Sequence, residues 1–330
     1  MAVTAPLLRA PFPWYGSKAR IAQAVWERLG DPGHYLEPFC GSAAVLLARP
    51  NWRPGLLETV NDLDGLLVNA YRAVRAAPVE VARWAEWPVS ELDLTPRQHC
   101  LIEARPELVA RLQGDPDFYD AKAAGWWLWG LACWVGDDWC SGQGTMTIER
   151  SPDGLVAVHH GTAVEGGVAR KAPHLTGPQG IKRVPRDESL ESWLSALAVR
   201  LSDVRITCGD WTRLLLDRHV HVDNVCRSPV AVFLDPPYAA ARKVRYHHDG
   251  AGTARRVRDW CLNEAPRDWR VALCGLAGEH DELEQAGWSV LRWVDDSDGW
   301  GLGRGKGSNR AKETIWFSPA CEPPAQGSLW

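Results

Sequence analysis

The stretch Val230–Tyr238 reads VAVFLDPPY, and it decides which fold class the chain is predicted to adopt. Its first five residues are all apolar, which is typical of a strand buried on both faces of a parallel sheet. Pro236 and Pro237 then end the strand, because proline lacks the backbone N–H that a sheet ladder needs. Asp235 and Tyr238 are therefore predicted at the carboxyl end of a central strand, where open α/β sheets bind ligands.

The polar groups of this stretch suit the transfer of a group to the exocyclic amine of a nucleobase. Such an amine is a poor nucleophile, because its lone pair is delocalised into the ring. The Asp235 carboxylate and the Pro236 carbonyl can accept its N–H bonds and aim the lone pair at an electrophile. Tyr238 can stack on the base, a contact worth about 1–3 kcal/mol. Alone, the same string also fits a capped strand end with a buried tyrosine.

The rest of the chain repeats a strand–turn–helix rhythm, which indicates a doubly wound α/β sheet. Strands are predicted at 34–37, 56–60, 204–208 and 271–276, and helices at 21–29, 43–48 and 190–201. The rhythm is lost between Pro78 and about Ser189, which predicts an inserted subdomain. Within it, the tryptophan-rich run 125–134 is interpreted as a buried helix, with base stacking as the second interpretation.

Length and composition exclude several classes of protein. The 330 residues suffice for one large α/β domain or two smaller ones. A net charge of −4 argues against a uniformly basic nucleic-acid binder, although local basic patches remain compatible with it. Nine cysteines without paired spacing predict reduced thiols and no metal site. Without a signal peptide or a long apolar run, we expect a cytoplasmic protein that does not enter the membrane.

The DPPY string and its companion motifs resemble those of the D12 class of DNA adenine methyltransferases, the Dam-like family, and especially its phage-type branch. The companions are PFPWYGSK at 11–18, EPFCGSA at 37–43, and Asp62 about 20 residues after Gly41. The resemblance covers most of the chain. It implies a class I S-adenosylmethionine-dependent methyltransferase, Rossmann-like, with a mostly parallel seven-stranded sheet. Strands 289–294 and 313–317 would form its closing antiparallel pair.

The resemblance also implies a division of labour along the chain. Residues 1–80 and 190–330 would form a discontinuous catalytic domain, and the insertion 81–189 would recognise the target. The residues assigned to catalysis are Asp235, Pro236, Pro237 and Tyr238. Those assigned to S-adenosylmethionine are Trp14, Lys18, Glu37, Pro38, Phe39, Gly41, Asp62, Asp210 and Asp235.

Individual roles within the cofactor site are expected as follows. Lys18 would lie near the cofactor's carboxylate, and Asp210 would accept from its adenine amino group. Asp62 would hold the ribose hydroxyls. Both aspartates also fit the alternative of a helix N-cap. Ala43 replaces the second glycine of the family motif, which leaves less room for the methionine part of the cofactor.

Two basic stretches, 166–186 and 239–258, are expected to contact DNA phosphates. The residues predicted to bind DNA are Arg170, Lys171, Lys182, Arg183, Arg242, Lys243 and Arg245. The expected reaction is N6-methylation of an adenine flipped out of double-stranded DNA. The alternatives are N4-methylation of cytosine and a DNA-binding module that has the same fold but no turnover. A cognate restriction enzyme would be a further partner if the protein belongs to a restriction–modification system.

Overall fold

The computed structural model of the protein describes residues 8–12, 14, 16–134, 139–140, 146–151, 154–159, 189–216, 228–238, 250–293 and 313–324. The chain forms two compact units that alternate along the sequence. The first comprises Met1–Ser17, Asp62–Ser202 and Ile206–Gly209, and the second comprises Lys18–Asn61, Asp203–Arg205 and Asp210–Trp330. The expected division into a discontinuous catalytic domain, 1–80 and 190–330, and an insertion, 81–189, stays a prediction.

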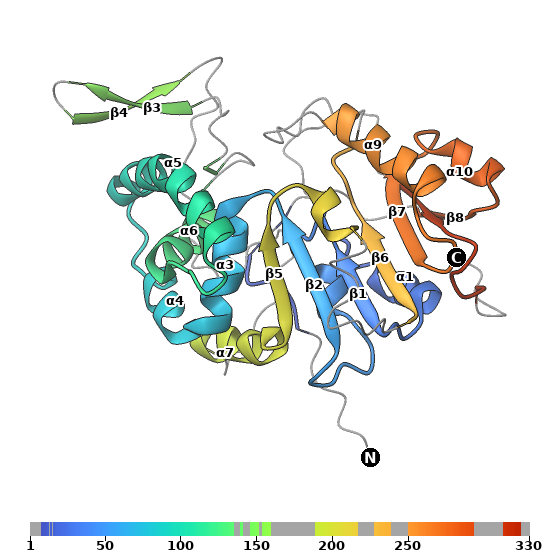
Figure 1. The fold of residues 1–330 in the computed structure, drawn as a ribbon. Helices are drawn as coiled ribbons and strands as arrows, with labels where there is room; N and C mark the ends of the chain where they lie inside the picture. The colour runs from blue at the N-terminus through green and yellow to red at the C-terminus, as the bar shows by residue number, and fades with distance from the viewer. Residues whose placement is uncertain are drawn as a thin grey trace. The chain divides into compact units, whose positions relative to one another are not determined.

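Seven strands form one sheet in the order β5-β2-β1-β6-β7-β9-β8 (Figure 1). The strands are β1 His34–Glu37, β2 Leu57–Asp62, β5 Val204–Cys208, β6 Val230–Leu234, β7 Arg270–Leu276, β8 Ser289–Trp293 and β9 Glu313–Phe317. β1 pairs in parallel with β2 and β6, and β6 pairs in parallel with β7. β9 runs antiparallel to β7 and β8. This mostly parallel sheet in an α/β chain is compatible with the predicted Rossmann-like fold.

The order of the strands reverses between β1 and β6. From β1 the chain proceeds to β2 and β5 on one side, and from β6 it proceeds to β7 on the other. All five residues of β6 are buried, as its unbroken apolar run predicts. Such a reversal is a topological switch point, and ligands bind there outside the carboxyl ends of the strands. The segments that follow β1 and β6, residues 38–43 and 235–238, therefore lie where this fold binds ligands.

Helices of the second unit cover both faces of its strands. They are α1 Ala22–Leu29, α2 Ala44–Leu47, the 3₁₀-helix η1 Trp211–Leu214, α9 Gly250–Asn263 and α10 Asp281–Gln285. Trp260 of α9 and Leu283 of α10 share a hydrophobic cluster with Trp316 of β9. The guanidinium of Arg28 in α1 lies 4.5 Å from the ring centroid of Phe317, the next residue of that strand. Because successive strand residues point to opposite faces, α1 covers the face opposite α9 and α10.

The first unit is mainly helical. Its helices are α3 Gly65–Ala76, α4 Pro78–Ala85, α5 Glu91–Gly114, α6 Ala121–Cys133 and α7 Leu190–Leu201, and its hairpin pairs β3 Met146–Ser151 with β4 Gly154–His159. α6 carries the tryptophan-rich run, and Trp127 and Trp129 are fully buried, which confirms the buried-helix interpretation for these two residues. Gly125 lets α4 approach closely, because a Cβ there would lie 2.3 Å from the Trp84 Cβ. Across the described part of the chain, no helix has the length and apolar character needed to cross a membrane.

Candidate active site

The Asp235 carboxylate is bonded at both of its oxygens, directly after β6. Lys18 Nζ lies 2.9 Å from Oδ2, and the Tyr238 hydroxyl donates to Oδ1 at 3.2 Å. Lys18 Nζ also lies 5.4 Å from the centroid of the Tyr238 ring. The fold therefore joins a residue predicted for the cofactor to two residues predicted for catalysis. A carboxylate has about four lone-pair sites, so Asp235 can still accept further hydrogen bonds.

Lys18 is 6% exposed, and its charge depends on Asp235. Burial by itself lowers the pKa of the Lys18 ammonium, but the Asp235 carboxylate, together with the charge of Glu313, outweighs this effect. The pKa of Lys18 therefore lies above its ordinary value, and the side chain is an ammonium at neutral pH. Its carboxylate partner here belongs to the protein. The expected contact with a carboxylate of the cofactor stays a prediction.

Beside this ion pair lies a gap too small to admit a water molecule, and it is lined by Lys18, Ile21, Tyr238, Cys274, Glu313, Thr314 and Ile315. Glu313 begins β9 and pairs with Leu276 at the carboxyl end of β7, because β9 runs antiparallel to β7. Burial and then the Asp235 charge raise the pKa of the Cys274 thiol, so it stays protonated and is not a nucleophile. Glu313 is a second carboxylate near the ammonium, and sequence analysis did not identify it.

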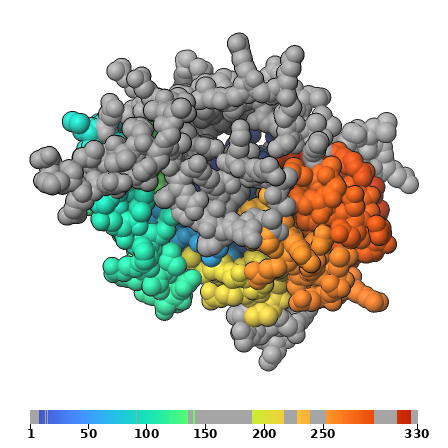
Figure 2. Space-filling view, turned by 90° about the horizontal axis from the view of Figure 1, so that it is seen from above, coloured from blue at the N-terminus to red at the C-terminus, as the bar shows by residue number. Residues whose placement is uncertain are grey.

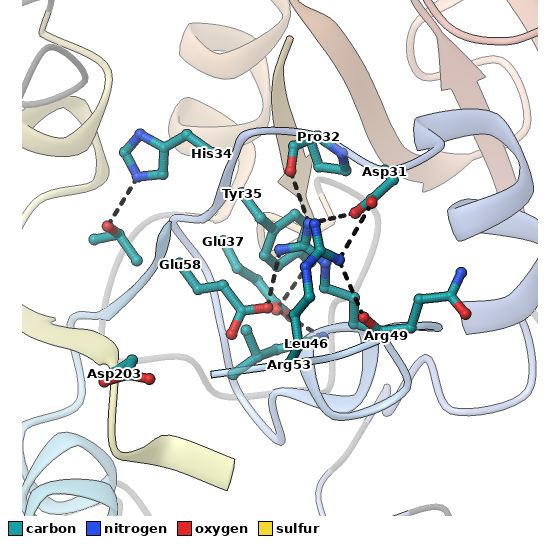
Figure 3. Close-up of polar contacts among 12 residues, drawn as sticks. Asp31, Pro32, His34, Tyr35, Glu37, Leu46, Arg49, Arg53, Glu58 and Asp203 are labelled. Atoms are coloured by element: carbon teal, nitrogen blue, oxygen red, sulfur yellow. Dashed lines mark hydrogen bonds and ion pairs between the residues drawn. The ribbon is translucent and has the colours of Figure 1, made fainter. Parts of the chain in front are cut away.

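Glu37 ends β1 and is 2% exposed. Its Oε2 accepts from the Tyr35 hydroxyl at 3.0 Å and from the Leu46 N–H at 3.2 Å (Figure 3). Burial raises the pKa of Glu37 to about 8, although the two hydrogen bonds oppose this, and the Asp235 charge adds to the rise. The Glu37 carboxyl is therefore mostly protonated at neutral pH, and it connects β1 to α2 across the turn that was predicted to contact the cofactor.

This turn, residues 38–43, has an unusual backbone. Gly41 has φ 44°, and Ala43 has φ 47° and ψ 32°, so both lie in the left-handed region. An alanine in this region is strained by roughly 1–2 kcal/mol, whereas glycine is not. This left-handed conformation explains why the motif that the turn resembles has glycine at the positions of both Gly41 and Ala43. Asn61 stabilises the turn through two hydrogen bonds. Its side-chain amide donates to the Pro38 carbonyl at 3.1 Å, and its backbone carbonyl accepts from the Cys40 N–H at 2.9 Å.

Asp210 lies after β5, and its Oδ1 caps η1. It accepts from the Thr212 N–H at 3.0 Å and from the Thr212 hydroxyl at 2.5 Å. The alternative N-cap role is thus observed, while Oδ2 lies 3.8 Å from the guanidinium of Arg256. Trp211 packs against Phe39, with ring centroids 5.9 Å apart. Trp211 is 5% exposed, and its Nε1 is a buried donor without a hydrogen-bond partner in the described part of the chain.

The first unit contains two further predicted cofactor residues. The Trp14 ring lies 5.9 Å from that of Phe12 and 6.2 Å from that of Trp127. Asp62 Oδ1 accepts from the Asp64 N–H at 3.0 Å. The N-cap of α3 is Asp64 rather than Asp62, because Asp64 accepts from the Leu66 N–H. The contact of Trp14 and Asp62 with a cofactor stays a prediction.

Comparisons with models of protein families and with curated proteins find no match for this chain. The residues predicted to bind DNA, namely Arg170, Lys171, Lys182, Arg183, Arg242, Lys243 and Arg245, all lie outside the described residues.

Proposed function

We propose that this protein is an S-adenosylmethionine-dependent DNA methyltransferase that methylates N6 of adenine, as its resemblance to the D12 class implies. One observation carries the proposal. The Asp235 carboxylate follows the central strand β6 at the switch point of the sheet and is fixed by the Lys18 ammonium at 2.9 Å. The seven-stranded sheet with a closing antiparallel pair supports the proposal, because the resemblance implied that arrangement.

The second unit has polar and aromatic groups that fit S-adenosylmethionine. Asp210 provides an acceptor for the adenine amino group, and Phe39 and Trp211 provide aromatic surface beside it. Trp211 Nε1 is a buried donor at this place, and among the described residues it has no hydrogen-bond partner. Gly41 has no side chain, so a ligand can approach the backbone of the turn. Phe39, Gly41 and Asp210 would hold the cofactor, which supplies an electrophilic methyl group when bound.

The residues around Asp235 would position the target amine. Asp235 and the Pro236 carbonyl would accept its two N–H bonds, which holds the nitrogen near tetrahedral geometry with its lone pair free. The Lys18 pair keeps the carboxylate in one orientation, so positioning costs little entropy when the base arrives. A base of high pKa is not required, because the amine becomes acidic as it is substituted. The Tyr238 ring would stack on the flipped base.

The experiment is methylation of unmodified DNA in vitro, followed by mass spectrometry of the nucleosides. Parent protein should form N6-methyladenine, and Asp235→Asn should form none while melting as a folded protein. The matched control is Asp259→Asn, at a half-buried aspartate of α9 that pairs with Arg258, and it should retain activity.

Each other outcome has a definite meaning. N4-methylcytosine as the sole product would retain the mechanism and overturn the substrate. Parent protein that binds DNA without modifying it would contradict the proposal in favour of a binding module. Full activity of Asp235→Asn would remove Asp235 from the reaction.

A further inference from the structure

Arg256 of α9 lies beside Asp210, and sequence analysis counted it only as part of a basic stretch. Its Nη1 is 3.8 Å from Asp210 Oδ2, and its Cζ is 5.7 Å from the ring centroid of Trp211. The Arg256 side chain is 58% exposed and that of Asp210 is 47% exposed, so a ligand can reach both. In Figure 2 the yellow surface around η1 adjoins the orange surface of α9, as this contact requires.

An exposed ion pair of this length contributes little to the stability of a fold. Its chemistry is more informative. Burial raises the pKa of Asp210, but the hydrogen bonds from Thr212 and the charge of Arg256 outweigh it, so the pKa lies below its ordinary value. Asp210 is thus an ionised carboxylate that only accepts hydrogen bonds, and Arg256 is a guanidinium that only donates them. Thr212 occupies Oδ1, which leaves Oδ2 as the acceptor next to the guanidinium.

An acceptor and a donor side by side match the edge of adenine. Adenine presents its amino group, a donor, next to a ring nitrogen that accepts, N1 on one side and N7 on the other. Hypoxanthine presents a carbonyl in place of the amino group and an N–H at position 1, so its N1 edge is the reverse. The rings of Trp211 and Phe39 beside the pair supply the apolar surface on which a flat base packs.

We propose that Arg256 is a specificity-determining residue of the cofactor site, which donates to a ring nitrogen of the cofactor's adenine while Asp210 accepts from the amino group. This inference rests on the proposed function, because the ligand is the adenosyl cofactor named there. Arg256 also lies on the helix that follows the DPPY segment in the chain. Recognition of the base would therefore involve the segment between the catalytic strand β6 and the next strand, β7.

The neighbouring Arg255 is a matched control. It lies on the same helix, is 76% exposed, and has its own partner, Asp259, at 3.8 Å. Removing either arginine takes one positive charge from the same helix. Only removal of Arg256 takes a donor from beside Asp210 and Trp211. If the arginines act only through their charge, both variants should bind the ligand more weakly. If Arg256 makes a specific contact, only its removal should weaken binding.

The experiment is calorimetric titration of the full-length protein with S-adenosylmethionine, together with competition by adenosine and by inosine. Arg256→Ala should weaken S-adenosylmethionine binding about tenfold, as expected for loss of one charged hydrogen bond at a partly exposed place. Arg255→Ala should bind like the parent, and Arg256→Lys should fall between. The parent should prefer adenosine to inosine, and this preference should shrink in Arg256→Ala.

Two failures are distinguishable. Parent protein that does not bind S-adenosylmethionine would contradict the proposed function and, with it, this inference. Parent protein that binds it, with Arg256→Ala binding equally well and keeping the same preference for adenosine, would overturn the inference alone. An equal loss in Arg255→Ala would also overturn it, because the effect would then be one of charge and not of contact. Thermal melting of each variant establishes that the protein titrated is folded.

Discussion

Glu37 holds a proton in the folded protein, and the free energy of unfolding falls as rising pH removes it. The pKa of this carboxyl is about 8 in the folded protein, against 4.5 as its ordinary value. Between these two values the folded protein holds a proton that the unfolded chain has lost, so the free energy of unfolding decreases with pH. The slope is about 1.4 kcal/mol per pH unit, which amounts to on the order of 4–5 kcal/mol over the whole window. The contribution is complete below about pH 4.5 and is lost as the pH rises through about 8.

Glu37→Gln removes this dependence, because glutamine does not ionise and its carbonyl oxygen can still accept from Tyr35 and Leu46. We expect parent and variant to be of similar stability near pH 5, and the variant to be more stable by several kcal/mol, on the order of 4, at pH 9. Urea denaturation of both proteins at each pH from 5 to 9 measures the difference. Other groups titrate in both proteins, so the difference isolates Glu37.

Parallel stability curves for parent and Glu37→Gln would refute this reasoning, since they would mean that burial leaves the pKa of Glu37 unchanged. Two further variants test the causes. Tyr35→Phe removes a hydrogen bond that lowers the pKa of Glu37, so the window should move to higher pH. Asp235→Asn removes a charge that raises it, so the window should move to lower pH. A shift to lower pH in Asp235→Asn would place the Glu37 carboxyl within electrostatic reach of Asp235.

Three other outcomes are expected. Gly125→Ala should destabilise the protein by about 1–3 kcal/mol, because α4 leaves no space for a Cβ, whereas Gly114→Ala, with nothing within 4 Å, should be tolerated; thermal melts compare the two. Tyr238→Phe should retain most of the methyl transfer that Tyr238→Ala loses, because stacking needs the ring; initial rates measure this. Burial lowers the pKa of His280, so stability should be lost as the pH falls below about 6.5, and His280→Leu should flatten this loss in denaturation at pH 5 and 7.

The sequence predicted strand positions well where an apolar run meets a residue that ends it. β6 stops at Leu234 before Asp-Pro-Pro, and β1 stops at Glu37 before Pro38, both at the predicted residues. α7 begins after Ser189, whose hydroxyl accepts from the Ser192 N–H, and serine is a favoured N-cap. Local chemistry of this kind acts over a few residues, so it can be recognised without knowledge of the fold.

Contacts between distant segments could not be predicted in the same way. Lys18 and Asp235 each belong to a recognisable motif, yet their ion pair depends on how α1 and β6 are arranged. Arg256 was visible only as one positive charge in a basic stretch, and helical spacing does not say which side chain it meets. Glu313 gave a usable signal that was missed. An antiparallel strand beside parallel ones begins at the edge where the others end, so its first residue lies among their carboxyl ends.

The closing antiparallel pair has a consequence for how the protein can change in evolution. β8 ends opposite the residue at which β9 begins, Trp293 against Glu313, so both ends of segment 294–312 are attached at one place on the sheet. Lengthening a segment anchored in this way costs little, about 0.6 kcal/mol for each doubling of its length. The length of segment 294–312 can therefore change in evolution while the strands that end at Leu234 and Glu37 stay unaltered.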